Sequence, residues 1–297
     1  MQLKWMEDLV ALAELRSYSR AAELRHVTHP AFGRRIRALE AWAGAPLVER
    51  EGSPVTLTAA GASLLENAQQ ILANVEHARA DLLQAAGRQA QRVTIATGRT
   101  LARTLAADLL LRLKPVLGAG EVQILTRSLT ETSQLLERGE VDFMLIYHHP
   151  LLAVRLSGRQ YAHLTVAQDR LVLVSRANAQ GKPQHALGSK TPLAHLAYSG
   201  TLALGRLVQD HLANNPRAPK LRRVLECDSA DAVCEYALKG LGVAWLPWSM
   251  VAPACKAGQL AVLGEAHLEI GFEVRAYRSK RRLSTLAEHA WTLLEGG

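Results

Sequence analysis

The sequence predicts three successive units: a small all-α unit, a long single helix, and an α/β unit built from two similar lobes. The first is predicted because residues 3–43 place apolar side chains three and four positions apart. The second is predicted because residues 64–85 keep a heptad pattern. From residue 92 onward, apolar strands alternate with amphipathic helices, which indicates parallel sheets covered by helices. We place the units at residues 1–61, 62–91 and 92–297.

Composition and charge narrow the class of protein. A chain of 297 residues with 48% hydrophobic content can bury a sizeable core, and its net charge of +8 suits nucleic acid or a membrane surface as partner. No apolar stretch reaches about 18 residues, so a membrane-spanning helix is excluded, and Lys4, Glu7 and Asp8 interrupt any signal peptide. The three cysteines form no CxxC pair, which indicates a reducing compartment. We therefore expect a cytoplasmic protein.

Three helices are expected in the first unit. The first starts at Leu3 and fades where the apolar spacing ends. Ser17 offers the N-cap of a short second helix, and residues 26–28 form a tight turn. Thr28 then caps a third helix, whose first turn accepts Pro30 because an N–H at that position would have no intrahelical partner.

The third helix is strongly basic. Four arginines and no carboxylate lie between Arg25 and Arg37, although residues 1–61 carry a net charge of only +1 (8 basic minus 7 acidic). Two helices joined by a short turn, the second one basic, form the helix-turn-helix pattern, whose second helix enters the major groove of DNA. Residues 45–61 add a strand–turn–strand wing, with Arg50 beside the turn for a phosphate. The alternative is a solvated basic helix without a partner.

A long run of residues in this unit stands at the spacing of a known family: Ala21, Ala22, Pro30, Ala31, Arg34, Ile36, Leu39, Glu40, Gly44, Leu47–Arg50 and Leu57–Gly61. The segment resembles the DNA-binding domain of the LysR-type transcriptional regulators. The resemblance implies a winged helix-turn-helix domain that binds double-stranded DNA. The residues expected at the DNA are Thr28, His29, Pro30, Phe32, Gly33, Arg34, Arg35, Arg37 and Arg50. His29 replaces the family's usual base-reading Gln and Gly33 its usual Ser, so the family's base preference does not transfer there.

The long helix has an apolar seam. Its residues alternate four and three apart: Leu64, Ala68, Ile71, Val75, Ala78, Leu82 and Ala85. The seam is expected to pair with a second copy, as the linker helices of the family do, and packing on its own domain is the alternative. Two DNA half-sites need two recognition helices, so we expect a dimer or a tetramer. Residues 87–92 form the polar hinge.

The α/β unit reads as two sets of alternating elements. The expected strands are residues 92–97, 121–128, 141–147, 169–176, 196–199, 221–229, 242–247 and 272–278. The expected helices are residues 100–114, one that runs through 137–139, 204–213, one that ends at Lys239, and 283–294. These segments resemble the family's effector domain, which has two Rossmann-like lobes and is built like a periplasmic binding protein. Lobe I is expected to comprise residues 92–161 and 268–297, and lobe II residues 162–267.

Ligands of such sheets bind beyond the carboxyl ends of the strands, so a cleft between the lobes is the expected effector site. The residues expected there are Gly98, Arg99, Thr100, Ser128, Thr130, Ser199, Thr201, Arg206 and Trp248. The family resemblance points to the same segments for Thr100, Thr130 and Ser199–Thr201. Because arginines 99, 127 and 206 stand near two helix starts, a small anion such as a carboxylate is the expected effector.

A closer resemblance is to the hypochlorite-responsive (HypT-like) subgroup of LysR-type regulators, carried by Lys4-Trp5, residues 30–40, Gly205–Leu207 and residues 242–247. That subgroup is thought to sense methionine oxidation, so a redox sensor acting through Met or Cys is the alternative function. Here Leu204 and Ala230 stand where methionines are expected. Met144 and Met250 are better explained as core residues, and Cys227 and Cys234 as buried thiols.

Other classes of function find less support. No GxxxxGK[ST] or GxSxG motif is present, and His148-His149 lack nearby acidic or Cys partners for a metal. We expect no catalysis, no cofactor and no metal. A solute-binding protein would need an export signal and would have no use for residues 1–61. The expected partners are double-stranded DNA, a small effector, further copies of the chain and RNA polymerase, with no membrane.

Overall fold

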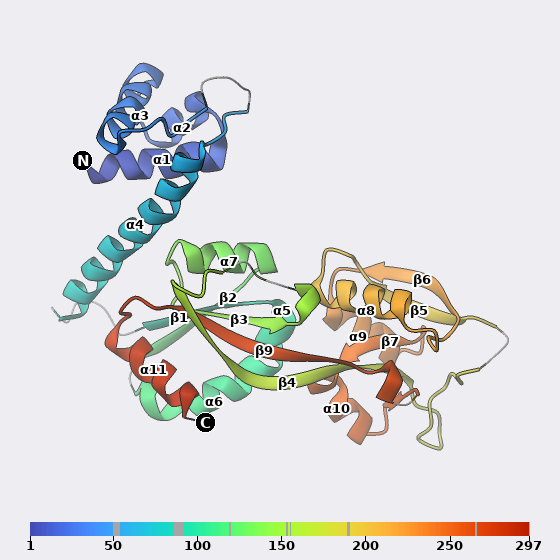
Figure 1. Cartoon of the computed structure of the whole chain (residues 1–297). Coiled ribbons are helices and arrows are strands. Elements are labelled where there is room, and N and C mark those ends of the chain that lie inside the picture. The colour runs from blue at the N-terminus through green and yellow to red at the C-terminus, as the bar shows by residue number, and fades with distance from the viewer. Residues whose placement is uncertain are drawn as a thin grey trace.

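The computed structural model describes residues 1–49, 54–85, 92–118, 120–152, 154, 156–188, 191–264 and 266–296. A small helical domain lies at one end of the long helix α4 (Ala59–Ala85), and a larger α/β domain follows that helix in the chain (Figure 1). This is the fold class that the sequence predicts. Residues 50–53 and 86–91 are not among those described, so the expected Arg50 contact and nearly all of the expected hinge lie outside the described residues.

Three helices form the small domain: α1 (Leu3–Leu15), α2 (Tyr18–Leu24) and α3 (His29–Ala43). Ser17 caps α2 and Thr28 caps α3, since each hydroxyl accepts a hydrogen bond from the N–H three residues later. The wing contains an antiparallel bridge between Val48 and Leu57, which are residues expected in its two strands. The helix-turn-helix and the base of a wing are therefore both present.

Helix α4 begins against the small domain and extends away from it (Figure 1). Near its start, Ala68 is fully buried, and α1 packs against the helix. Further along, the seam residues Ile71, Val75 and Leu82 are exposed. The packing of the described residues in one chain thus leaves the second half of the apolar seam open to water.

Lobe I contains a parallel core of β1 (Arg92–Thr97), β2 (Glu121–Thr126) and β3 (Phe143–His148). Its sheet is covered on one face by α6 (Leu105–Leu117) and α11 (Thr285–Glu295), and on the other by α7 (Leu129–Glu137) (Figure 1). Strands β1 and β2 begin at their expected starts, and β3 and α11 begin two residues after theirs. Helix α7 ends at Glu137, before the expected residues 138–139, and the helix after β1 differs more.

That helix was expected to run unbroken over residues 100–114, and the structure corrects this. The chain forms a short helix α5 (Arg99–Arg103) and then α6, with Thr104 between them at φ −99° and ψ −95°. The Thr104 N–H still donates to the Thr100 carbonyl at 3.1 Å, and the Thr104 hydroxyl donates to the same oxygen at 2.8 Å. The break therefore lies in the non-helical ψ angle of Thr104 and not in the loss of its hydrogen bond to Thr100. Pro115 lies within the last turn of α6 instead of ending the helix before it.

Lobe II is built around a parallel pair of strands, β5 (Leu193–Tyr198) and β6 (Leu221–Cys227). Its other elements are α8 (Ala203–Asn214), α9 (Ala230–Leu238), β7 (Ala244–Pro247), α10 (Trp248–Lys256) and β8 (Leu260–Val262). The sequence did not predict α10 and β8. Helix α10 tolerates Pro253 in its interior, a residue that argues against a helix when the sequence is read alone.

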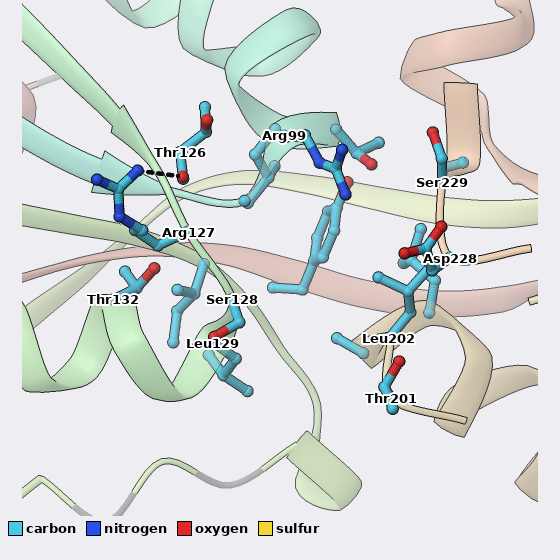
Figure 2. A pocket seen from close by; sticks show the side chains of 18 of the residues that line it. Arg99, Thr126, Arg127, Ser128, Leu129, Thr132, Thr201, Leu202, Asp228 and Ser229 are labelled. Carbon is cyan, nitrogen blue, oxygen red and sulfur yellow. Dashed lines mark hydrogen bonds between the residues drawn. The ribbon is translucent and has the colours of Figure 1, made fainter. Parts of the chain in front are cut away.

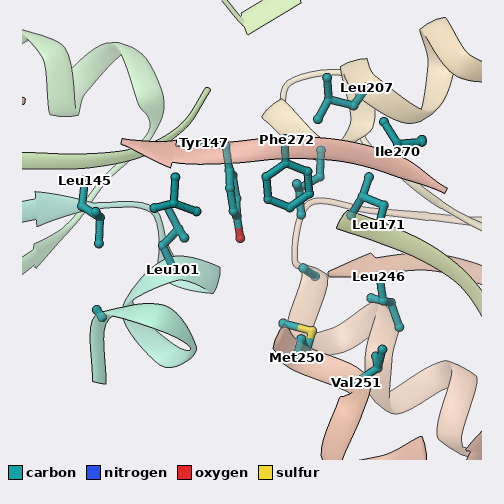
Figure 3. Packing of buried hydrophobic residues seen from close by; sticks show 14 of the residues in the cluster. Leu101, Leu145, Tyr147, Leu171, Leu207, Leu246, Met250, Val251, Ile270 and Phe272 are labelled. Atoms are coloured by element: carbon teal, nitrogen blue, oxygen red, sulfur yellow. The ribbon is translucent and has the colours of Figure 1, made fainter. Parts of the chain in front are cut away.

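Two long antiparallel strands connect the lobes: β4 (Tyr161–Arg176) and β9 (Ile270–Ser279). They complete one sheet of order β2-β1-β3-β9-β4-β7, in which β8 also pairs with β4. The buried cluster between the lobes is continuous, and in it the rings of Tyr147 and Phe272 lie edge to face, at 78° and with 4.9 Å between centroids (Figure 3). The lobes therefore share strands and core, and the boundaries proposed from sequence fall at or beside the starts of β4 and β9.

Candidate DNA-binding surface and effector cavity

The start of α3 presents a polar, basic surface. Thr28, His29 and Pro30 are exposed at the N-terminus of this helix, and Arg34 and Arg37 are exposed further along it. A Cβ atom added at Gly33 would meet no atom within 4 Å, so open space lies above that glycine. An exposed helix N-terminus followed by two arginines without an ion-pair partner among the described residues is suited to bind phosphate and base edges in a major groove.

Two of the residues expected at the DNA need a correction. Phe32 is fully buried among the three helices and packs edge-on against Tyr18, with 6.0 Å between ring centroids. Its aromatic ring belongs to the core because Phe32, Ile36 and Leu39 share one face of α3. Arg35 turns toward the domain, where its Nη1 atom lies 3.5 Å from Asp8 Oδ2.

Asp8 organises the inner side of this surface. Its side chain is fully buried, and its Oδ1 atom accepts a hydrogen bond from Arg25 Nε at 2.9 Å. Arg25 also pairs with Glu7. Two of the four arginines of the basic segment are therefore neutralised within the domain, which leaves Arg34 and Arg37 as its outward-facing cations.

A cavity of about 590 Å³ lies between the two lobes (Figure 2). The lobe I side is formed by the ends of β1, β2 and β3 and by the starts of α5 and α7. The lobe II side is formed by the starts of α8 and α9. Its polar wall residues are Gly98, Arg99, Thr100, Thr126, Arg127, Ser128, Glu131, Thr132, Tyr147, Thr201, Asp228, Ser229 and Asp231. The cavity thus lies where the strand-end rule places a ligand.

The residues expected from sequence divide into two groups. Gly98, Arg99, Thr100, Ser128 and Thr201 line the cavity. Thr130, Ser199, Arg206 and Trp248 do not.

The four misplaced residues each have a local reason. Thr130 and Arg206 are exposed on their helices, and the Ser199 hydroxyl is hydrogen-bonded to that of Thr201 at 3.0 Å. Trp248 borders a separate cavity of about 580 Å³ beside α10, where the Arg170 guanidinium stacks over its ring at 5.2 Å. The expectation failed for these residues because it located the correct segments without the direction of each side chain.

Carboxylates in the cavity wall were missed. Asp228 immediately follows β6, and Asp231 lies in the first turn of α9. Asp231 pairs with Arg103 of α5, so this ion pair connects lobe II with lobe I at the edge of the cavity. Asp228 follows a strand end, like the residues that were selected, and the same rule could have found it.

On the lobe I side, Glu131 forms a capping box with Ser128: the Ser128 N–H donates to the Glu131 carboxylate at 3.0 Å, and the Ser128 hydroxyl donates to it at 2.6 Å. These hydrogen bonds lower the pKa of the Glu131 carboxyl. The Arg127 guanidinium donates to the Thr126 carbonyl at 2.8 Å (Figure 2). The backbone thus fixes the position of Arg127, whose positive charge also lowers the pKa of the Glu131 carboxyl.

Two buried hydroxyls also reach the cavity wall. Thr132 Oγ1 and the Tyr147 hydroxyl have no hydrogen-bond partner among the described residues. Burial raises the pKa of Tyr147, so the phenol stays protonated and can donate. Buried polar atoms without partners are rare in folded proteins because each costs free energy, so these two hydroxyls are ready to bond a ligand or water.

Two family models match the chain. Residues 3–62 match the helix-turn-helix model of bacterial regulatory proteins of the lysR family, and residues 86–296 match the LysR substrate binding domain. The chain belongs to the LysR family. Within the described residues, no helix of this LysR-family chain is both long and apolar enough to cross a membrane.

Relatives are similar to this LysR-family chain over nearly its full length. The transcriptional regulator YjiE of Escherichia coli is 26% identical over 292 residues, which are 98% of this chain and 93% of the relative. The structure of Vibrio fischeri DarR in complex with DNA has 28% identity and a TM-score of 0.60, covering 99% of this chain and 98% of that one. HypT of Salmonella typhimurium, a hypochlorite-specific LysR-type regulator, has 26% identity and a TM-score of 0.60, covering 100% and 98%. This chain is a LysR-type DNA-binding transcriptional regulator with an effector-binding domain.

Proposed function

We propose that the surface at the start of α3 binds promoter DNA in the major groove. Thr28, His29 and Pro30 would lie at the backbone and base edges, with Gly33 allowing close approach. Arg34 and Arg37 would supply the positive charge, while Arg35 supports the surface from behind through Asp8. The observation that carries the proposal is the coincidence of an exposed helix N-terminus with two exposed arginines on a helix-turn-helix. Arg50 on the wing is proposed as a further phosphate contact.

The test is an Arg34→Ala variant in a gel shift with the promoter region of the protein's own gene. Operator binding should weaken. If Arg34 contacts a phosphate, the slope of log K against log salt should fall by about 0.9. If it binds a guanine, about 1–3 kcal/mol of discrimination should vanish at one base pair. Arg217→Ala, which removes an exposed arginine from the effector domain, is the matched control. Wild-type binding by Arg34→Ala would refute the placement of α3.

The cavity between the lobes is the proposed effector site, and its lobe I side favours an anionic group. Arg99 and Arg127 stand at this side, and the Thr132 and Tyr147 hydroxyls add donors. An Arg99→Gln, Thr100→Ala double variant should lose the effector response and keep basal DNA binding, because the two sites lie in separate domains. A full response from this double variant would show that the effector binds elsewhere.

The chain is proposed to act as a dimer or higher oligomer in the cytoplasm, where its DNA target lies. The exposed seam of α4 supports self-association, since Ile71, Val75 and Leu82 leave apolar surface in water. We also propose that the effector domain regulates DNA binding and catalyses no reaction.

Redox sensing remains the second function to test, because HypT is among the similar proteins. The structure offers little support for redox sensing. Met144 is fully buried, Met250 nearly so, and burial raises the pKa of the Cys234 thiol to about 11. A thiol with so little thiolate reacts slowly with peroxide. Peroxide-sensitive DNA binding that a Cys234→Ser variant loses would reverse this preference.

A further inference from the structure

Charges of both signs face the cavity. Arg99 comes from lobe I and Asp228 from lobe II, on opposite sides of the space (Figure 2). Neither side chain has an ion-pair partner among the described residues. The other two wall carboxylates are already engaged, Asp231 with Arg103 and Glu131 with Ser128.

Hydrogen bonds from the neutral Ser128 leave the negative charge of Glu131 in place, and Arg127 lowers the pKa of that carboxyl, so these two charges offset each other. The unbalanced charges are therefore Arg99 on lobe I and Asp228 on lobe II. A ligand with a single negative charge would satisfy the first side and leave the Asp228 carboxylate facing it. That arrangement is unfavourable, because a carboxylate that loses water without gaining a partner costs free energy and repels a second anion nearby. A ligand with a cationic group on the lobe II side removes both penalties.

We propose that the effector is a small zwitterion of the α-amino acid type, with its carboxylate toward Arg99 and its ammonium group bound by Asp228. This proposal rests on the assignment of the cavity as the effector site. The Thr132 and Tyr147 hydroxyls, buried and without partners, complete the hydrogen bonds of the carboxylate end. The remaining wall favours an apolar side chain, since it is made by Leu101, Leu129, Ile146, Leu202, Ala203, Leu204 and Ala230.

Matched probes separate the cationic from the anionic contribution. Isothermal titration calorimetry on the full chain would compare leucine, valine and phenylalanine with their 2-hydroxy acids, which keep the carboxylate and the side chain but lack the ammonium group. At least one amino acid should bind, and its 2-hydroxy acid should bind at least tenfold more weakly. Asp228→Asn should weaken binding of the amino acid at least tenfold and should strengthen binding of the 2-hydroxy acid, because the repulsion from the Asp228 carboxylate is gone. Arg99→Gln should weaken both.

Glu226→Gln is the matched control, because Glu226 is an exposed carboxylate on the preceding strand that pairs with Arg223 and does not line the cavity. Melting temperatures of all variants confirm that each is folded. The zwitterion is excluded if the 2-hydroxy acid binds as tightly as the amino acid, if Asp228→Asn binds the amino acid like the wild type, or if no amino acid binds. Binding of the hydroxy acids alone, weakened by Arg99→Gln, would keep the cavity as an anion site. Binding that no cavity variant alters would overturn the site itself, and the gel shift tests the DNA surface independently.

Discussion

At the scale of single residues, Asp8 is a carboxylate without access to water. Its two oxygens face Arg25 and Arg35, so the residue joins α1 to the helix-turn-helix. Asp8→Ala should lower the free energy of unfolding of the small domain by about 3 kcal/mol, because Arg35 loses its buried partner and Arg25 keeps only the exposed Glu7. Urea denaturation of the full chain, followed through the transition of this domain, measures the effect.

Glu7→Gln is the control for that experiment. Glu7 also pairs with Arg25 but is 41% exposed, so its loss should cost no more than about 1 kcal/mol. Equal effects of the two substitutions would contradict the distinction between a buried and an exposed carboxylate.

His195 makes the stability of lobe II depend on pH. Its ring packs edge-on against Trp245, and burial together with the positive charge of Arg223 lowers the pKa of His195 to about 4. Between pH 6.5 and pH 4 the His195 imidazole is protonated in the unfolded chain but stays neutral in the folded chain. The free energy of unfolding should therefore fall as the pH is lowered through this window, by about 3 kcal/mol in total.

Urea denaturation at several pH values tests this slope. His195→Gln should flatten it, while His289→Gln, a change at an exposed histidine, should leave it as in the wild type. A residual slope is expected, because burial also lowers the pKa of His148 and His211. The prediction fails if His195→Gln and wild type lose stability in parallel.

Single residues also show how far the sequence can be interpreted alone. Thr28 as an N-cap and Arg34 as an exposed cation follow from local rules, because a cap and a helix face depend on neighbours in the chain. Asp8 as the partner of Arg35 does not, since these residues meet only when α1 and α3 pack. The burial of Phe32 could have been predicted, because its spacing to Ile36 and Leu39 places the three residues on one helix face.

At the scale of elements, two glycines of the small domain have opposite surroundings. Gly33 lies inside α3 with free space around it, whereas a methyl group at Gly61 in α4 would overlap the carbonyl oxygen of Leu47. Gly33→Ala should stabilise the domain by about 0.5–1 kcal/mol, because alanine loses less backbone entropy in a helix. Gly61→Ala should destabilise it, because α4 must move away from the wing.

Melting temperatures of the two variants, measured on the full chain without DNA, test both predictions. A lower melting temperature for Gly33→Ala would mean that the space above this glycine is filled, and an unchanged one for Gly61→Ala would mean that the start of α4 is free to shift.

The elements themselves were predictable to different degrees. Strands such as β1 and β3 are continuous apolar runs with polar ends, so sequence locates them well. The break at Thr104 was hidden, because apolar residues keep helical spacing on both sides of it and only the backbone angles of Thr104 reveal the interruption. The position of the cavity was predicted from the sequence, but the charges that line it were not, because Asp228 and Arg99 come from different lobes that the fold brings together.

At the scale of the whole molecule, an ion pair connects the DNA-binding and effector domains. Arg138, at the end of α7, lies 2.7 Å from Glu14 near the end of α1. Both side chains are about one-third exposed, so the pair should contribute about 0.5 kcal/mol. Glu14→Arg and Arg138→Glu should each destabilise the small domain, and the double charge swap should restore most of the loss.

A double-mutant cycle on urea unfolding of the full chain measures this coupling. Arg112→Glu, a charge reversal at an exposed position of α6, is the control. Strictly additive effects of the two substitutions would show that the contact has no energetic weight.

Helix α7 meets the cavity at one end and the DNA-binding domain at the other. Ser128, Glu131 and Thr132 stand in the cavity wall, and Arg138 contacts Glu14 further along the helix, about 9 Å beyond Thr132 and about 15 Å beyond Ser128 at 1.5 Å per helical residue. A bound effector that changes the position of α7 must alter the free energy of the Glu14 contact. Thermodynamic reciprocity then requires the converse: operator DNA has to change the affinity for the effector by the same factor by which the effector changes the affinity for DNA. A promoter fragment would thereby change the affinity of the cavity for its effector without entering the cavity.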